Sequence, residues 1–176
     1  MTVMSTLLRC GRPRALKQLL GIAACALAAA CTSPSYQAEA LQASDSGDQK
    51  TAIRLAAKDV AKFSTPDQCS PEKNTNCGTL ALAYGSLAQY QILNGDKAAG
   101  ERSFSNAQRA LGWMDRADRP SATAMVYHDV SEAFWKVGDR ARAVAVFKQG
   151  RAAGGDGWLF FASAAQAAEQ EPAAAH

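Results

Sequence analysis

Residues 79–113 read TLALAYGSLAQYQILNGDKAAGERSFSNAQRALGW, and this stretch decides the fold class. On either side of Asn94-Gly95-Asp96, apolar residues recur at three- and four-residue spacing, which is typical of helices. Glycine is favoured just past a helix C-terminus and aspartate at an N-cap, so the tripeptide ends one helix and begins the next. We therefore predict two antiparallel helices, over residues 79–93 and 96–113, joined by a tight corner.

The same corner recurs along the chain. Val137-Gly138-Asp139 separates two further helical segments, and Ser46-Gly47-Asp48 is a third candidate copy. Alanine is abundant and runs of β-branched residues are absent, which favours helix over strand. The sequence therefore predicts an all-α fold of about six helices in antiparallel pairs. The expected helices cover residues 46–63 (with a capping box at Ser46 and Gln49), 79–93, 96–113, 121–137, 139–153 and 156–170 (capped by Asp156).

The two clearest corners belong to a repeating pattern. When each corner glycine is set at position 15, small residues fall at positions 8, 20 and 27, and aromatic residues at positions 4 and 24. This pattern resembles the tetratricopeptide repeat (TPR), a 34-residue helix–turn–helix unit that stacks into a superhelix. The matching residues are Tyr84, Ala88, Gly100, Phe104 and Ala107 in the first copy, and Tyr127, Ser131, Ala143, Phe147 and Gly150 in the second.

The resemblance implies a TPR-like α-solenoid with extra residues between its repeats. Residues 115–123 and the segment around Cys69 and Cys77 accommodate the extra length between corners. The continued register places Phe161 at the aromatic position of a final helix, with Ala164 and Ala165 at its apolar and small positions. A generic alanine-rich helical bundle stays open as the alternative, since Gly-Asp is common wherever one helix ends and another begins.

In the TPR family, the first helix of each repeat lines a concave groove that binds peptides. Apolar, adaptable and aromatic side chains interleaved with polar ones suit such a groove. The same apolar residues at helical spacing are equally consistent with the core. The resemblance places these residues in the partner-binding groove: Leu82, Gly85, Gln89 and Ile92 from the first copy, and Met125, His128, Glu132 and Trp135 from the second.

The N-terminus carries export signals. Basic residues between Arg9 and Lys17 precede a short apolar run over residues 19–30, which ends at Cys31. This is the pattern of a secretory signal peptide, and the run is shorter than the roughly 20 residues that a membrane-spanning helix needs. Leu27-Ala28-Ala29-Ala30-Cys31 resembles the lipobox of bacterial lipoproteins. That resemblance implies cleavage before Cys31 and fatty acyl chains, such as palmitate, on its sulfur.

The residue after Cys31 bears on location. In such lipoproteins an Asp there often signals retention at the inner membrane, and Thr32 implies an outer-membrane lipoprotein that faces the periplasm. Two alternatives stay open. Cys25, which follows Ile22-Ala23-Ala24, is a second candidate for lipidation, and ordinary secretion with cleavage after an alanine would leave no lipid.

The predicted domain boundaries follow from the signal. We expect residues 1–30 to be removed, 31–45 to form a tether with a helical stretch around Tyr36 to Ala43, 46–171 to fold as the TPR-like helical domain, and 172–176 to be a flexible tail. Removal takes away four of the 19 Lys and Arg residues and none of the 16 Asp and Glu residues, which leaves a net charge of −1. The basic excess of the full chain belongs to the signal, so the sequence gives no argument for binding to nucleic acid or anionic lipid, and we predict no nucleic-acid partner.

Cys69 and Cys77 lie in a polar, turn-rich segment of the mature chain. In an oxidising compartment this pair predicts a disulfide. A metal or redox site is disfavoured because there is no Cys-x-x-Cys and no His nearby. His128 and Glu132 share a helix face but supply too few ligands for zinc and no nucleophile. We therefore predict no enzymatic activity, metal or cofactor, apart from the covalent lipid on Cys31.

Two functions of different classes fit these features. The first is a lipid-anchored adaptor that binds an envelope protein in the periplasm, as assembly factors and pilotins of this repeat family do; this analogy is at the level of the fold. The second is an inhibitor or immunity lipoprotein that neutralises a toxic periplasmic enzyme.

Overall fold

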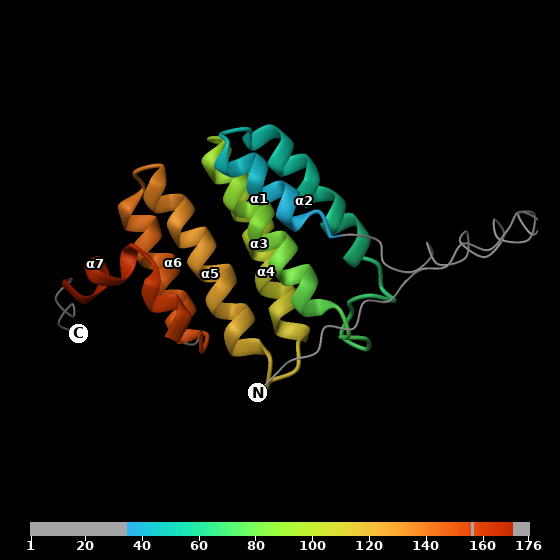
Figure 1. Ribbon diagram of the computed structural model, residues 1–176. Helices are drawn as coiled ribbons and strands as arrows, with labels where there is room; N and C mark the ends of the chain where they lie inside the picture. The colour runs from blue at the N-terminus through green and yellow to red at the C-terminus, as the bar shows by residue number, and fades with distance from the viewer. Residues whose placement is uncertain (1–34, 156, 171–176) are drawn as a thin grey trace, which may run out of the picture. The chain divides into compact units, whose positions relative to one another are not determined.

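The computed structural model describes residues 35–155 and 157–170. These residues form helices and no strands, which confirms the predicted all-α fold of packed helix pairs (Figure 1). Cys31, the signal peptide and the tail at 172–176 lie outside the described residues. The elements are α1 (Gln37–Asp45), α2 (Gln49–Phe63), α3 (Cys77–Leu93), α4 (Lys97–Trp113), α5 (Arg119–Lys136), α6 (Arg140–Ala152), the 3-10 helix η1 (Gly157–Phe161) and α7 (Ala164–Gln170).

Three corners share one geometry. Gly47, Gly95 and Gly138 have φ angles of 86°, 90° and 81°, a left-handed conformation that glycine adopts without strain. In each corner the aspartate after the glycine donates its backbone N–H to the carbonyl oxygen five residues earlier, at 2.9 Å, which forms a Schellman motif. The side chain of the same aspartate caps the next helix, with Thr51, Ala99 and Arg142 donating their backbone N–H groups.

The capping-box prediction at Ser46 was wrong. Asp48 is the N-cap of α2, and its Oδ1 accepts from the N–H of Thr51 at 3.0 Å. Gln49 instead turns its side-chain amide back to the carbonyl of Ser44 at 3.1 Å. The corner at residues 46–48 therefore matches the two downstream corners, because Asp48 takes the position that Asp96 and Asp139 take there.

The helices form successive pairs, α1–α2, α3–α4 and α5–α6, and the pairs stack differently at their two junctions (Figure 1). At the second junction α5 packs along α3 and only slightly on α4. At the first, α3 packs along α2 and touches α1 only at an edge. Residues 64–76, which separate α2 from α3, make this different approach possible.

Small residues bring the paired helices close together. A Cβ atom on Gly100 would lie 2.5 Å from Ile92 Cγ1 and 3.1 Å from the carbonyl oxygen of Ala88, so only glycine fits without displacement. In the next pair the hydroxyl of Ser131 donates to the carbonyl oxygen of Ala143 at 3.0 Å. Direct contact between positions on facing helices explains why both copies carry small residues there.

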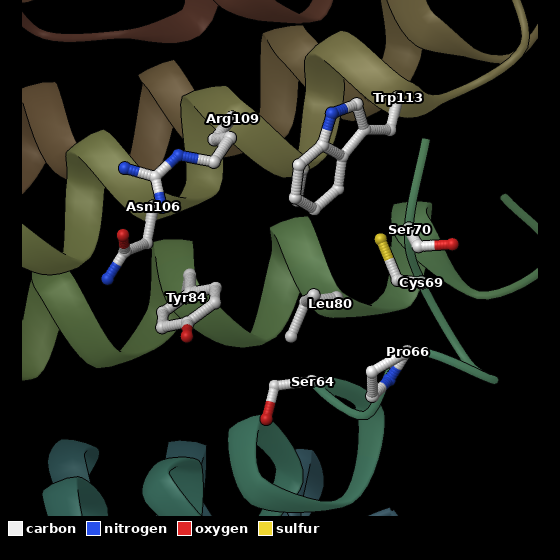
Figure 2. A pocket seen from close by; sticks show the side chains of 10 residues that line it. Ser64, Pro66, Cys69, Ser70, Leu80, Tyr84, Asn106, Arg109 and Trp113 are labelled. Atoms are coloured by element: carbon white, nitrogen blue, oxygen red, sulfur yellow. The ribbon is translucent and has the colours of Figure 1, made fainter. Parts of the chain in front are cut away.

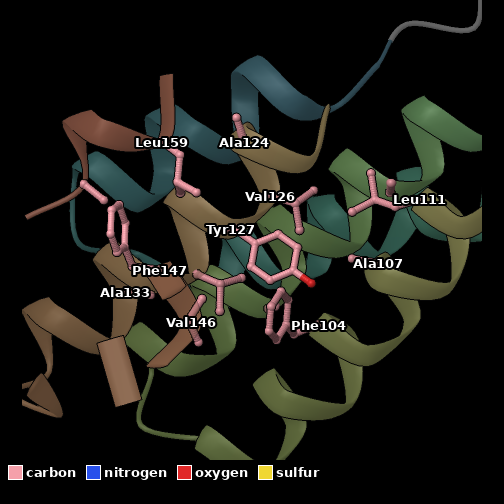
Figure 3. Packing of buried hydrophobic residues seen from close by; sticks show 14 of the residues in the cluster. Phe104, Ala107, Leu111, Ala124, Val126, Tyr127, Ala133, Val146, Phe147 and Leu159 are labelled. Atoms are coloured by element: carbon pink, nitrogen blue, oxygen red, sulfur yellow. The ribbon is translucent and has the colours of Figure 1, made fainter. Parts of the chain in front are cut away.

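An aromatic contact connects the second and third pairs. The rings of Phe104 in α4 and Tyr127 in α5 meet edge-to-face, with centroids 5.0 Å apart, inside the main core (Figure 3). Gln108 donates to the hydroxyl of Tyr127 at 2.9 Å, and burial raises the pKa of that phenol. The buried hydroxyl therefore has a partner, as a polar group in a core requires.

Two surface ion pairs also join these helix pairs. Lys97 Nζ lies 2.7 Å from Asp139 Oδ2, and Arg142 contacts both carboxylate oxygens of Glu101 at 2.6 and 2.7 Å. The hydrogen bond from Lys97 lowers the pKa of Asp139, and the bond to Glu101 raises the pKa of Arg142. Because all four side chains are partly exposed, each of these pairs adds only modest stability.

Three helix boundaries differ from the prediction. Helix α3 begins at Cys77, two residues early, and α5 begins at Arg119 rather than Ser121 because Pro120 is tolerated in a first turn. Residues 37–45 form α1, which extends two residues beyond the helical stretch expected around Tyr36 to Ala43 and packs on α2 instead of serving as a tether. Its N-terminus is held by Asp59 of α2, whose carboxylate accepts from the Tyr36 N–H at 3.0 and 3.1 Å.

The last predicted helix was wrong in its form. The 3-10 helix η1 and the short helix α7 replace a continuous helix over 156–170, and Asp156 lies outside the described residues. Leu159 is the buried residue of η1, whereas Phe161, predicted to fill the aromatic position, is 73% exposed. Ala164 and Ala165 are buried as expected. The tighter 3-10 turn changes which side chains face α5 and α6.

Candidate partner-binding surface

The predicted groove residues of α3 do not form an open surface. Ile92 is fully buried, so it belongs to the core and not to a groove. Leu82 is half-buried and packs against the main core, and Gly85 lies against Val126 of α5. Gln89 is also half-buried. Helix α3 therefore offers few side chains to a partner, because α5 packs along it.

The predicted groove residues of α5 are covered in part by the chain itself. The ring of His128 lies 6.2 Å from that of Trp158 between centroids, and Glu132 accepts from both the backbone N–H and the hydroxyl of Ser163, the latter at 3.0 Å. Trp135 is half-buried, with the guanidinium carbon of Arg140 3.6 Å from its ring centroid. The C-terminal segment thus occupies much of the face that the resemblance assigned to a peptide.

Exposed aromatic side chains gather instead on η1. Trp158, Phe160 and Phe161, here called the aromatic patch, all have exposed rings, and Trp158 is 54% exposed. The rings of Trp158 and Phe161 lie 5.4 Å apart between centroids. Phe160 points to α6, where its ring meets Phe147 and the guanidinium of Arg151. Met125 is exposed as well, one turn before His128 on α5.

A buried anchor holds the aromatic patch in place. Leu159, between Trp158 and Phe160, is fully buried in the main core (Figure 3). It fits against Gly150 of α6, where a Cβ atom would lie 2.8 Å from Leu159 Cδ2 and 2.7 Å from Tyr127 Cβ. Because the backbone is fixed by Leu159, the rings on either side present a surface that loses little conformational entropy on binding.

A second concave feature lies beside the disulfide. Cys69 and Cys77 are bonded, as predicted, and the bond ties residues 64–76 to the start of α3. A pocket of about 320 Å³ opens between this loop, α3 and α4 (Figure 2). It is lined by Ser64, Pro66, Cys69, Ser70, Leu80, Tyr84, Asn106, Arg109, Ala110 and Trp113.

The pocket beside the disulfide has an apolar floor and a polar rim. Leu80 and Tyr84 of α3 face the ring of Trp113 across it, and Arg109 stands at the edge (Figure 2). Its volume is at the lower end of the range for small-ligand sites, which is about 300–1,000 Å³. A single apolar side chain with a carboxylate or carbonyl near the guanidinium would match this lining.

Within the described part of the chain, no three His, Cys, Asp or Glu side chains come together in a way that could hold a metal ion. His128 has Asp129 as its close polar partner, with Nδ1 3.1 Å from Oδ1. Among residues 35–155 and 157–170, no helix is both long and apolar enough to cross a bilayer.

Comparison with known proteins returns no matching family model, no matching curated protein and no matching solved structure. The aromatic patch was missed at the sequence level, although a signal was present. Trp158-Leu159-Phe160-Phe161 places four large apolar residues in a row, more than one face of a helix can bury.

Proposed function

We propose that this protein is a lipid-anchored adaptor of the bacterial envelope, without enzymatic activity, that binds a partner protein in the periplasm through the aromatic patch. One observation carries the binding surface. Trp158 and Phe161 are 54% and 73% exposed on either side of the fully buried Leu159. Large exposed aromatics on a fixed backbone are the residues that most often dominate protein–protein binding energies.

A TPR-like scaffold is supported by repeated local geometry. The corners after α1, α3 and α5 have the same left-handed glycine and the same aspartate cap. The close contact between positions 8 and 20 recurs in the second and third pairs, where Gly100 faces the carbonyl oxygen of Ala88 and Ser131 donates to that of Ala143. Under this proposal η1 and α7 act as the terminal cap of the stack, since they pack on α5 and α6.

The periplasmic location is supported by chemistry at two places. The lipobox-like sequence ending at Cys31 supports cleavage and acylation there. The Cys69–Cys77 disulfide suits an oxidising compartment such as the periplasm. Outer-membrane placement follows from Thr32 and is part of the same proposal.

The test is capture of a partner from cross-linked envelopes by the lipidated full chain. The double variant Trp158→Ala/Phe161→Ala should lose at least about tenfold of the captured partner, since each exposed aromatic hot spot contributes about 2 kcal/mol or more. Leu41→Ala is the matched control, because Leu41 is 51% exposed on α1 and carries no ring contact. Equal capture by wild type and the double variant would refute the patch as the binding surface.

The same experiment distinguishes the adaptor proposal from the inhibitor hypothesis. An immunity lipoprotein would capture a toxic enzyme, and its co-expression with that enzyme would restore growth. An adaptor would instead capture a component of an envelope assembly, and co-expression would have no protective effect.

A further inference from the structure

Helix α2 carries a stripe of basic side chains. Lys50, Arg54, Lys58 and Lys62, here called the basic stripe, follow one another at four-residue spacing, which keeps them along one side of the helix. The first three are exposed, and the ammonium of Lys62 lies over the ring of Phe63 at 4.9 Å from the centroid. This local cluster of positive charge is not apparent from the net charge of −1 of the predicted mature chain.

The acidic residues near α2 do not neutralise the three exposed cations of the basic stripe, Lys50, Arg54 and Lys58. The only carboxylate of α2 is Asp59, which is 4% exposed and is occupied by the Tyr36 N–H and the Ser35 hydroxyl. Asp48 caps the N-terminus of α2 near Lys50 and Arg54. Glu39 of α1 shares an open hollow with Arg54 and Lys58. The exposed carboxylates of Asp48 and Glu39 thus lie near Lys50, Arg54 and Lys58, and within the described residues none of these three cations forms a salt bridge.

The basic stripe lies where the proposed anchor leaves the fold. Ser35 is bound to Asp59 at 3.2 Å, and Lys58 Nζ sits 4.9 Å from the ring centroid of Tyr36. The chain advances only four residues from Cys31 to Ser35. Because a fully extended residue spans at most about 3.6 Å, Ser35 is always within about 14 Å of the lipidated residue. The membrane surface is therefore within reach of α2 whatever path residues 32–34 take.

We propose that the basic stripe binds the anionic phospholipid surface of the membrane that holds the Cys31 anchor, and so fixes the orientation of the helical unit. This inference rests on the lipidation proposed above. The acyl chains alone keep the protein on the membrane, since two or three of them anchor a protein stably. The basic stripe determines which face of the helical unit contacts the membrane. Each basic residue near an anionic surface strengthens the binding of that face about fivefold.

Orientation by α2 has a consequence for the aromatic patch. Among the described residues, α1 and α2 make no contact with α5, α6, η1 or α7. When α2 lies against the lipid headgroups, α1 and α2 are the helices at the membrane. The aromatic patch is on η1, which packs on α5 and α6 and does not contact α1 or α2. The patch then stays available to a periplasmic partner.

The test is lysine labelling of the lipidated full chain in two kinds of vesicle. With an amine-reactive reagent and mass spectrometry, the labelling rates of Lys50 and Lys58 should fall about fivefold in vesicles rich in phosphatidylglycerol, relative to phosphatidylcholine alone. Lys136, exposed at the end of α5, is the internal control and should label equally in both. The protection should disappear in high salt, which screens surface charge.

Matched variants isolate the charge. Lys50→Gln/Arg54→Gln/Lys58→Gln should lower the protection of Lys62 in phosphatidylglycerol vesicles. Arg102→Gln/Arg109→Gln/Lys136→Gln removes the same number of exposed cations from α4 and α5 and should leave that protection unchanged.

The possible results have distinct meanings. Equal labelling of acylated protein in both vesicle types overturns the inference and leaves the adaptor proposal standing. Protection of Lys50 and Lys58 in native envelopes but not in vesicles also overturns it, because a protein would then cover the basic stripe. An intact mass without acyl groups shows instead that the anchoring itself is wrong.

Discussion

Gly150 controls how closely α5, α6 and η1 approach one another. A methyl group there would lie 2.7 Å from Tyr127 Cβ, 2.9 Å from Tyr127 Cγ and 2.8 Å from Leu159 Cδ2. Tyr127 Cβ is bonded directly to the backbone of α5, so it cannot move aside by a rotamer change. The substitution Gly150→Ala must therefore shift helix α6 or expel η1.

Two opposing effects determine how much Gly150→Ala changes the free energy of unfolding. Overpacking a core by one methyl group costs about 1–3 kcal/mol. Alanine recovers about 0.5–1 kcal/mol over glycine in a helix. We therefore expect Gly150→Ala to lower the free energy of unfolding by about 1–2 kcal/mol.

Urea denaturation followed by tryptophan fluorescence and circular dichroism measures this loss. With a typical slope of about 1–3 kcal/mol per molar urea, the midpoint should fall by roughly 0.3–2 M. Gly112→Ala is the matched control, because nothing lies within 4 Å of the added methyl group near the end of α4. That variant should be as stable as wild type or slightly more stable. A Gly150→Ala midpoint at or above that of wild type would refute the close packing described for α5, α6 and η1.

Three further predictions concern stability. Leu159→Ala should lower the free energy of unfolding by about 2–5 kcal/mol in urea denaturation, because Leu159 is fully buried. Trp158→Ala, at an exposed ring, should change the urea midpoint little, and similar losses in the two variants would contradict the anchor role of Leu159. Cys69→Ala/Cys77→Ala should lower the unfolding free energy by about 2–3 kcal/mol, since the bond closes a short loop, and a thermal midpoint equal to wild type would oppose this. The hydrogen bond from Lys97 lowers the pKa of Asp139 in the folded state, so the charged carboxylate should stabilise the fold above the unfolded-state pKa near 4. That stabilisation should be lost as the pH falls through the lower folded-state pKa. Asp139→Asn should therefore flatten the dependence of the urea midpoint on pH between 2 and 6, and parallel curves for the two proteins would argue against the ion pair.

Local chemistry explains which parts of the fold were predictable. A glycine followed by aspartate satisfies the last carbonyls of one helix and the first N–H groups of the next within six or seven residues. The helix ends near Gly95 and Gly138 could therefore be predicted to within a residue or two. The disulfide was predictable for a similar reason, because Cys69 and Cys77 lie close together in one short loop.

Contacts between distant residues explain the misses. The docking of α1 on α2 involves Asp59, which lies 23 residues after the Tyr36 N–H that it accepts from. Neither segment by itself indicates that contact. The partial cover of the predicted α5 groove was missed for the same reason, since Glu132 accepts hydrogen bonds from Ser163, which lies 31 residues away. A repeat pattern assigns faces to helices, but it cannot show which face the rest of the chain will cover.

Local sequence was enough to predict the helices as far as α6, the corners, the close approach at small residues and the disulfide, because each arises from backbone and side-chain chemistry within a short stretch. Packing between distant segments buries Leu159 while Trp158 and Phe161 stay exposed, and it places the basic stripe of α2 beside Ser35. Both outcomes depend on how helices far apart in the chain share limited apolar surface, which no local pattern specifies.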